Sequence, residues 1–277
     1  MIQTKVTLHD EEFQLLRDLI YNHSGIYFTD NQSYILENRL SGRVKAKNFT
    51  SFQQYYFYLK YDKDAAQEMR EVMDLVTVKE TYFFREEYQF QILMDELLFS
   101  HAQRKKFGNP CIRIWSAACS TGEEPYSLAM LFKERFMGRM KAEILATDIN
   151  EKALAMACKG VYRRQSFRSM LPYFQAKYFD LIGDEYHLKN EVKKKVNFIY
   201  DNLISENRAF DQQVDVIFCR NVLIYFDQKA KKKAVANLHN ALKQEGYLFL
   251  GHSESLFNIT NSFQFRQFQN GIAYQKV

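Results

Sequence analysis

The sequence predicts an α/β fold with a doubly wound, mainly parallel sheet, preceded by an all-α segment. From about residue 112 onward, short apolar runs alternate with amphipathic helical patterns, which is typical of a parallel sheet covered on both faces. Residues 1–85 contain no proline and show only helical periodicity. Two final apolar runs, at residues 263–268 and 272–276, flank Asn270 and Gly271 and indicate a closing antiparallel hairpin.

The composition is that of an ordinary soluble globular protein. Of the 277 residues 47% are hydrophobic, and the net charge of +5 permits an acidic partner without requiring nucleic acid. There is no apolar run of about 18 residues and no basic-then-apolar leader, so we expect neither membrane insertion nor export. The four cysteines lack a C-x-x-C pair and the six histidines are scattered. We therefore expect a cytoplasmic protein with reduced thiols and no metal site.

The first 85 residues predict a small helical bundle. Gly25 is a plausible stop for the first helix, and Ser51 a cap for the third. Apolar residues mark four helices: 13, 16, 19 and 20; 36, 40 and 44; 52, 55, 56 and 59; and 69, 72, 73 and 76. Arg39, Arg43 and Lys47 recur every four residues on another face of the second helix. This stripe is either a solvated face or a docking surface for an acidic partner.

Residues 112–135 are the centre of the second part: an apolar strand, a turn of small residues and a helix opened by Pro125. This arrangement brings backbone N–H groups and a helix N-terminus close to a ligand. Glu123 and Glu124 suit the helix dipole there but would repel a phosphate. Neither G-x-G-x-x-G nor G-x-x-x-x-G-K-[ST] is present. The loop therefore favours a nucleoside ligand without phosphates.

Polar residues follow the expected strands at the edge where open α/β sheets bind ligands. Asp148 either accepts hydrogen bonds from ribose hydroxyls or caps the helix that begins near residue 151. Asn202 and Leu203, after the next strand, either meet a base or form a plain turn. The next strand is followed by Arg220 and Asn221, and Tyr225 lies one helical turn further on.

Three other stretches carry competing interpretations. Residues 78–85, VKETYFFR, are either a linker helix with core aromatics or polar site residues around an apolar centre. A helix is expected at residues 86–101. Residues 251–255, GHSES, nearly match a nucleophile elbow, but the final glycine is missing, so a hydrolase is disfavoured. A long connection between Cys158 and Val196 contains a turn at Gly183 and Asp184, which predicts a small inserted hairpin.

Taken together, the motifs resemble the chemotaxis receptor methyltransferases, the CheR family. The matching pieces, in the family's order, are TVKETYFFRE at residues 77–86, WSAACSTGEEPYS at 115–127, ATDIN at 146–150, FCRNVLIYFD at 218–227 and GHSES at 251–255. The second and fourth pieces are long and specific. The resemblance covers essentially the whole chain.

The resemblance implies a helical N-terminal domain at residues 1–85 that docks on the receptor. It implies an S-adenosylmethionine-dependent methyltransferase domain at residues 86–277, with a Rossmann-like sheet and an inserted β-subdomain at about 178–195. The reaction implied is methylation of glutamate side chains on the cytoplasmic domains of chemoreceptors, giving methyl esters and S-adenosylhomocysteine. We expect a monomer. A methyltransferase with another acceptor, or a non-catalytic cofactor-binding receptor scaffold, are the alternatives.

The resemblance also assigns residues. Arg85 and Tyr225 are the candidate catalytic residues, Arg85 orienting either the cofactor's carboxylate or the substrate's. Cofactor binding is implied for Lys79, Thr81, Arg85, Glu124, Asp148, Asn202, Leu203, Arg220 and Asn221. Lys79 departs from the family, which usually has Asn there. Receptor docking is implied for Arg39, Arg43, Lys45 and Lys47. The short loop around residues 182–186 lacks the extra Gly-x-Gly of members that bind a receptor's C-terminal tether pentapeptide, so we expect independence of that tether.

Overall fold

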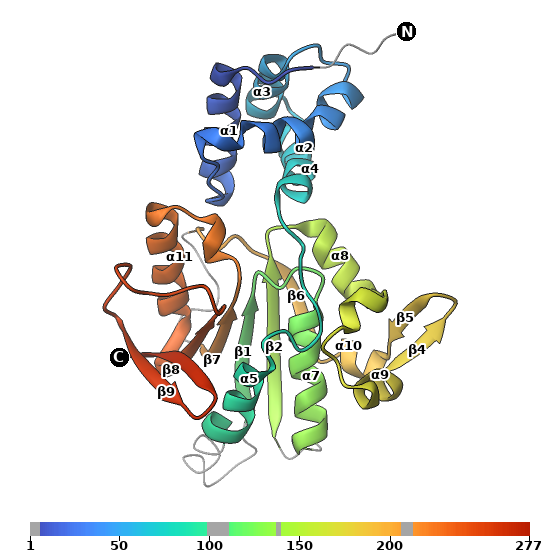
Figure 1. Cartoon of the computed structure of the whole chain (residues 1–277), viewed down its shortest axis with the longest axis vertical. Coiled ribbons are helices and arrows are strands. Elements are labelled where there is room, and N and C mark those ends of the chain that lie inside the picture. Colours follow the sequence, from blue (N-terminus) through green and yellow to red (C-terminus); the bar gives the residue numbers. More distant parts are fainter. Residues whose placement is uncertain (1–5, 99–110, 137–139, 206–212) are drawn as a thin grey trace. The chain divides into compact units, whose positions relative to one another are not determined.

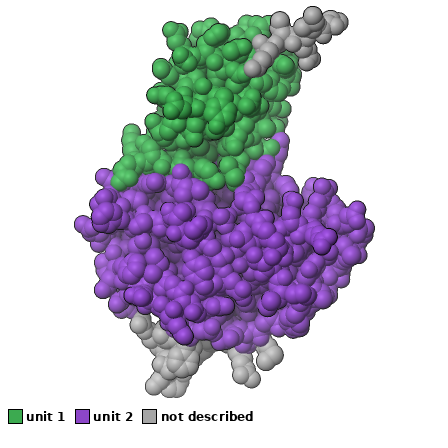
Figure 2. Space-filling model, in the orientation of Figure 1, with its two compact units in different colours: residues 1–78, 225–230 green, residues 79–224, 231–277 purple. Residues whose placement is uncertain are grey.

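The computed structural model describes residues 6–98, 111–136, 140–205 and 213–277. The chain forms two compact units (Figure 2). Unit 1 comprises residues 1–78 and 225–230, and unit 2 comprises residues 79–224 and 231–277. The division after Val78 falls earlier than the domain boundary expected after Arg85. In the part of the chain that the structure describes, every helix is too short or too polar to span a bilayer.

Unit 1 contains the four expected helices: α1 (Asp10–Ser24), α2 (Ser33–Ala46), α3 (Phe52–Tyr61) and α4 (Ala65–Val76), with a short 3-10 turn, η1 (Asp30–Gln32). Gly25 ends α1 in the left-handed region, at φ 77°, as expected. The Ser51 hydroxyl accepts the Gln54 N–H at 3.2 Å and caps α3. Leu36, Leu40 and Val44 are fully buried, so the apolar stripe of α2 is its core face.

Unit 2 is built on a seven-stranded sheet in the order β6-β2-β1-β7-β8-β10-β9 (Figure 1). Its strands are β1 (Cys111–Ala117), β2 (Lys141–Asp148), β6 (Val196–Tyr200), β7 (Val214–Cys219), β8 (Leu242–Leu250), β9 (Phe263–Phe268) and β10 (Gly271–Lys276). The first five strands in this order pair parallel, and β10 runs antiparallel to both neighbours. This is the predicted doubly wound sheet with an antiparallel end.

The longer helices of the sheet region are α7 (Glu123–Phe136), α8 (Glu151–Lys159) and α11 (Gln228–Ala241). The first begins two residues before Pro125, where the sequence had placed its start. The helix expected at residues 86–101 begins at Glu87: α5 (Glu87–Gln91) continues into a π-helical turn, η2 (Ile92–Leu97), and the helical run extends through Leu98. Its expected end and the polar stretch at residues 103–110 lie outside the described residues.

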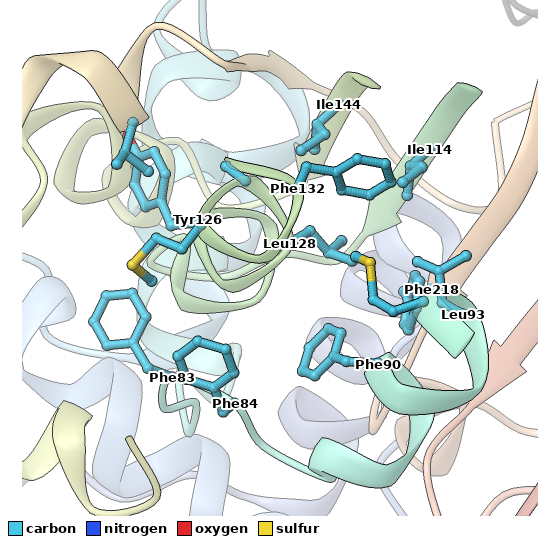
Figure 3. Packing of buried hydrophobic residues seen from close by; sticks show 14 of the residues in the cluster. Phe83, Phe84, Phe90, Leu93, Ile114, Tyr126, Leu128, Phe132, Ile144 and Phe218 are labelled. Carbon is cyan, nitrogen blue, oxygen red and sulfur yellow. The ribbon is translucent and has the colours of Figure 1, made fainter. Parts of the chain in front are cut away.

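Residues 79–86 are not a linker helix. Phe84 and Glu86 have left-handed backbones, with φ near 60° and 54°, so no regular helix runs through them. The Phe83 N–H donates to the Ser166 carbonyl and the Phe84 N–H to the Ser127 hydroxyl. Both rings are buried, and Figure 3 shows them, together with Phe90, beside helix α7. The two aromatic residues therefore anchor this segment to the core of unit 2.

The inserted hairpin is confirmed and belongs to a larger insertion. β4 (Phe179–Ile182) and β5 (Glu185–Leu188) pair antiparallel around the turn at Gly183 and Asp184, and β3 (Val161–Tyr162) adds a third strand. The insertion also holds η3 (Arg164–Phe167), α9 (Pro172–Tyr178) and α10 (Asn190–Lys193). It therefore begins earlier than residue 178.

Candidate active site

The loop after β1 has an unusual backbone. Ala118, Ser120 and Gly122 all have positive φ, at 58°, 52° and 92°. A Cβ on Gly122 would lie 2.8 Å from the Ala157 Cβ and 3.2 Å from the Phe198 ring, so only glycine fits. The strain at the two other positions is held by the surrounding structure, as is common at binding sites.

Asp148 organises this loop from the end of β2. Its carboxylate accepts the N–H groups of Ser120 and Asn150, each at 2.8 Å, and the residue is buried. The cap of α8 is Asn150, whose side chain accepts the Ala153 N–H at 2.9 Å. The capping alternative for Asp148 is therefore wrong. Burial raises the pKa of Asp148, and the backbone hydrogen bonds and Lys79 partly oppose this.

Glu124 forms a buried ion pair with Arg220. One carboxylate oxygen accepts the Ser116 hydroxyl at 2.6 Å, and the other accepts Arg220 Nε at 2.5 Å. The Arg220 side chain is only 3% exposed, and its guanidinium lies 5.2 Å from the Phe90 ring centroid. The negative charge expected at the start of α7 is thus neutralised by a residue from the end of β7.

Arg220 also binds the segment that precedes α5. Its Nη1 donates to the Arg85 carbonyl at 2.7 Å and to the Gln89 side chain at 3.3 Å, and lies 3.9 Å from a Glu86 oxygen. Burial acts to raise the pKa of Glu86, but His252 and Arg220 lower it overall. The sequence analysis missed Glu86 and Gln89 as partners of Arg220, since no spacing distinguishes them from solvated polar residues.

Glu123 is buried as well, at 2% exposure. Its carboxylate accepts the Thr121 hydroxyl at 2.6 Å and the Ser166 hydroxyl at 3.1 Å. Burial raises its pKa, and the two hydroxyl donors and the charge of Arg168 oppose this only in part. Glu123 therefore faces the protein rather than a ligand.

The remaining expected cofactor residues occupy loops of unit 2. Lys79 is exposed, Thr81 is half-buried, and Arg85 Nη1 donates to the Glu80 carbonyl at 3.0 Å. Asn202 forms a turn by accepting the Ile204 N–H at 3.1 Å, and Leu203 is buried. Asn221 has φ 57°. Because Asp148 pairs with Tyr200, and Ala117 with both Thr147 and Cys219, the loops after β6, β2, β1 and β7 follow neighbouring strand ends.

Tyr225 clusters with unit 1, where its carbonyl accepts the Tyr27 N–H at 2.9 Å. Three of the four expected docking residues are engaged within unit 1 as well. Arg43 and Lys47 bind the buried Glu68, and Arg39 Nη1 donates to the Val76 carbonyl at 2.5 Å. Lys45 is exposed.

The site fits the nucleoside of a cofactor that lacks phosphates. Ser120 Oγ is buried and has no hydrogen-bond partner among the described residues, and it lies on the loop that Asp148 holds. A ligand hydroxyl would satisfy this atom. The buried carboxylate of Asp148, which accepts a hydrogen bond from this loop, would instead disfavour a phosphate. These features, with the strand order of the sheet, define a Rossmann-like α/β domain with a candidate nucleoside site at the carboxyl edge of its sheet.

Comparison with known proteins gives the family. The family model "CheR methyltransferase, SAM binding domain" matches residues 79–272, and "CheR methyltransferase, all-alpha domain" matches residues 11–77. The chain belongs to the CheR methyltransferase family. The family model supports S-adenosylmethionine as the cofactor, as the resemblance implied.

Several named relatives are similar over nearly their whole length. The "Chemotaxis protein methyltransferase 2" of Vibrio cholerae is 36% identical, and the match covers 98% of this chain and 95% of the relative. The "Chemotaxis protein methyltransferase" of Borreliella burgdorferi is 36% identical, covering 91% and 90%. That of Escherichia coli is 33% identical, covering 95% and 90%.

Proposed function

We propose that this protein transfers the methyl group of S-adenosylmethionine to glutamate side chains on the cytoplasmic domains of chemoreceptors. The products are glutamate methyl esters and S-adenosylhomocysteine, and the reaction serves chemotactic adaptation in the cytoplasm. The observation that carries the proposal is the match to both CheR domains along the chain, together with relatives that are named as chemotaxis protein methyltransferases.

The chemistry of the acceptor suits a site without a general base. A glutamate side chain has a pKa near 4.3 and is already a carboxylate at neutral pH. When bound, S-adenosylmethionine supplies an electrophilic methyl group on a sulfonium. The protein's contribution is then to orient the two reactants and to remove water from the carboxylate.

Within this proposal, Asp148 accepts hydrogen bonds from the ribose, and Asn202 and Leu203 meet the base. The rest of the cofactor is held by side chains from the segment before α5, from α7 and from the end of β7: Lys79, Thr81, Arg85, Glu124, Arg220 and Asn221. The contact between Arg220 Nη1 and the Arg85 carbonyl supports this grouping, because it ties two of these segments together in unit 2.

Arg85 and Tyr225 are the proposed catalytic residues. The Arg85 guanidinium has one donor engaged, at the Glu80 carbonyl, and lies 5.7 Å from the Tyr82 ring centroid. An arginine has further N–H groups with which to hold a carboxylate. We propose that these donors orient either the cofactor's carboxylate or the substrate's, and that the Tyr225 hydroxyl lines the transfer path.

We propose that the protein is a monomer and that unit 1 docks on the receptor. Among the four expected docking residues, Lys45 is the exposed one, so it carries the docking role with least conflict. Arg39, Arg43 and Lys47 already have partners within the unit. The two-residue turn at Gly183 and Asp184 supports tether-independent methylation. Measurable affinity for a receptor C-terminal pentapeptide would contradict that part.

The test is methyl transfer from labelled S-adenosylmethionine to a receptor cytoplasmic fragment, followed by mild alkali. The proposal predicts label that is released as volatile methanol, because a carboxyl methyl ester is hydrolysed by base. Alkali-stable label would indicate another acceptor chemistry. Absence of label with cofactor binding intact would favour a non-catalytic scaffold.

A further inference from the structure

The turn after β8 reaches across to the segment after β7. Glu254 follows Gly251 in this turn and is buried at 9% exposure, although it is charged. One carboxylate oxygen accepts the N–H groups of Gly251 and Asn221, each at 2.7 Å. The other accepts the N–H groups of Val222 at 2.9 Å and Ile224 at 3.3 Å. Four backbone donors thus occupy the four acceptor positions of one carboxylate.

The backbone that Glu254 holds is one that needs support. Asn221 has φ 57°, in the left-handed region that is uncommon outside glycine. Three of the four N–H groups belong to residues 221–224, so one side chain fixes both the strained residue and the turn that follows it. Those N–H groups point at the carboxylate and are satisfied by it rather than by secondary structure.

Gly251 is required by the same arrangement. A Cβ at this position would lie 2.6 Å from Asn221 Nδ2, 2.8 Å from Glu254 Oε2 and 2.9 Å from the Asn221 backbone nitrogen. Contacts this short do not occur, so any side chain at position 251 would displace Asn221 and Glu254 from their present places. The glycine and the glutamate of GHSES, which the sequence analysis assessed only as an incomplete nucleophile elbow, therefore act on the same neighbour.

We infer that Glu254 is a positioning residue for methyl transfer: its carboxylate fixes the backbone of residues 221–224 and thereby presents Arg220 and Asn221 to the cofactor. Glu254 contacts neither the cofactor nor the substrate in this account. Its role rests on the cofactor role proposed for Arg220 and Asn221.

The test compares Glu254→Gln with Glu87→Gln, which makes the same change at an exposed glutamate of unit 2. An amide replaces one acceptor oxygen by N–H₂, which faces backbone donors and releases at least one of them. The dissociation constant for S-adenosylhomocysteine, measured by calorimetry well below the unfolding temperature, should rise about tenfold or more in Glu254→Gln. It should stay unchanged in Glu87→Gln.

Gly251→Ala is a second route to the same displacement that leaves every charge in place, and it should also weaken binding of S-adenosylhomocysteine. A lower thermal midpoint for Glu254→Gln with wild-type affinity in the folded protein would overturn the proposal, because a purely structural residue would behave so. In the wild type, the amides of Asn221 and Val222 should exchange slowly with solvent. Exchange as fast as in an exposed loop would overturn it without any variant.

Cofactor binding needs no receptor, so this test is separate from that of the proposed substrate. A wild-type protein that binds S-adenosylhomocysteine but methylates no receptor fragment would refute the proposed substrate and leave the role of Glu254 to be decided by the binding constants.

Discussion

Two buried glutamates in this chain meet an arginine, with different consequences. In unit 1, Glu68 on α4 is 2% exposed and accepts two hydrogen bonds from Arg43 on α2, at 2.8 and 2.6 Å. The Tyr55 hydroxyl on α3 and the Lys47 ammonium complete its shell, at 2.8 and 3.3 Å. In unit 2, Glu124 shares Arg220 with the Arg85 carbonyl and with Gln89.

The difference lies in what the partners are attached to. The side-chain partners of Glu68 come from α2, from Lys47 directly after it and from α3, so that Glu68 on α4 links three helices of the bundle. Arg220 itself follows β7 at the carboxyl edge of the sheet, where α/β sheets bind ligands. Its partners come from the first turn of α7, from α5 and from the segment that precedes α5. The same kind of ion pair therefore links helices in unit 1 and, in our proposal, holds the segments of the cofactor site together in unit 2.

The largest expected effect is that of Arg220→Ala. It leaves Glu124 buried without its cation, which should cost about 3–5 kcal/mol of the free energy of unfolding. It also releases the Arg85 segment, so binding of S-adenosylhomocysteine should be lost. Urea denaturation measures the free energy of unfolding, and calorimetry measures the affinity for S-adenosylhomocysteine. Full affinity in a stably folded Arg220→Ala would remove Arg220 from the site.

Arg43→Ala should be destabilising too, but by less. Arg43 is partly exposed, at 28%, and Lys47 and Tyr55 stay beside Glu68. We expect a loss of about 1–3 kcal/mol in the free energy of unfolding, with the affinity for S-adenosylhomocysteine unchanged. Lys45→Ala, on the same helix, is the matched control and should leave stability within about 0.5 kcal/mol. An equal loss in both would contradict the link between helices.

The pH dependence should have opposite signs in the two units. Burial acts to raise the pKa of Glu68, but hydrogen bonds from Arg43, Tyr55 and Lys47 lower it overall. Its contribution to stability is therefore complete above its ordinary pKa of 4.5 and is lost as the pH falls through the lowered value. In unfolding experiments below pH 4.5, Glu68→Gln should lose less stability than the wild type.

Glu123 should behave in the reverse way. Burial raises its pKa above 4.5, so its contribution is complete below pH 4.5 and is lost as the pH rises through the raised value. The stability of Glu123→Gln relative to the wild type should therefore improve from pH 4.5 toward neutral. A flat difference across this range would mean that Glu123 is charged in the folded protein without penalty.

The smallest effect is expected at Lys79, where the family usually has Asn. Lys79 is exposed, and its positive charge acts to lower the pKa of Asp148. Lys79→Asn should change the dissociation constant for S-adenosylhomocysteine by less than about threefold. A larger change would give Lys79 a direct contact with the cofactor.

Local patterns allowed much of the fold to be predicted. β9 was expected with the bounds that it has, because apolar residues and turn signals define short strands. Gly25 and Ser51 end and begin helices through their own backbone and side-chain chemistry. By contrast, α5 starts late because Glu86 adopts a left-handed backbone, a tertiary effect that no helical pattern reveals.

The site was predicted less completely, since it depends on pairs that are distant in sequence. The ends of strands marked Asp148 and Arg220 as candidates, but nothing local joined Arg220 to Glu86 or Gln89. The helical spacing of Arg43 and Lys47 showed a basic stripe without showing Glu68 opposite it. The pattern therefore left a solvated face and a docking surface as alternatives, and the docking role of these residues stays a prediction.

We propose that the cofactor binds at the carboxyl edge of the sheet, on the loop that Asp148 holds, and that the ion pair of unit 1 takes no part in binding it. The most direct measurement is calorimetry of S-adenosylhomocysteine binding to the wild type, Asp148→Ala and Glu68→Gln. We predict that Asp148→Ala weakens binding strongly, by about tenfold or more, because the proposed ribose partner and the hydrogen bond that holds the loop are both lost. Glu68→Gln should bind as the wild type does. Unchanged affinity in Asp148→Ala, or an equal loss in both variants, would contradict it.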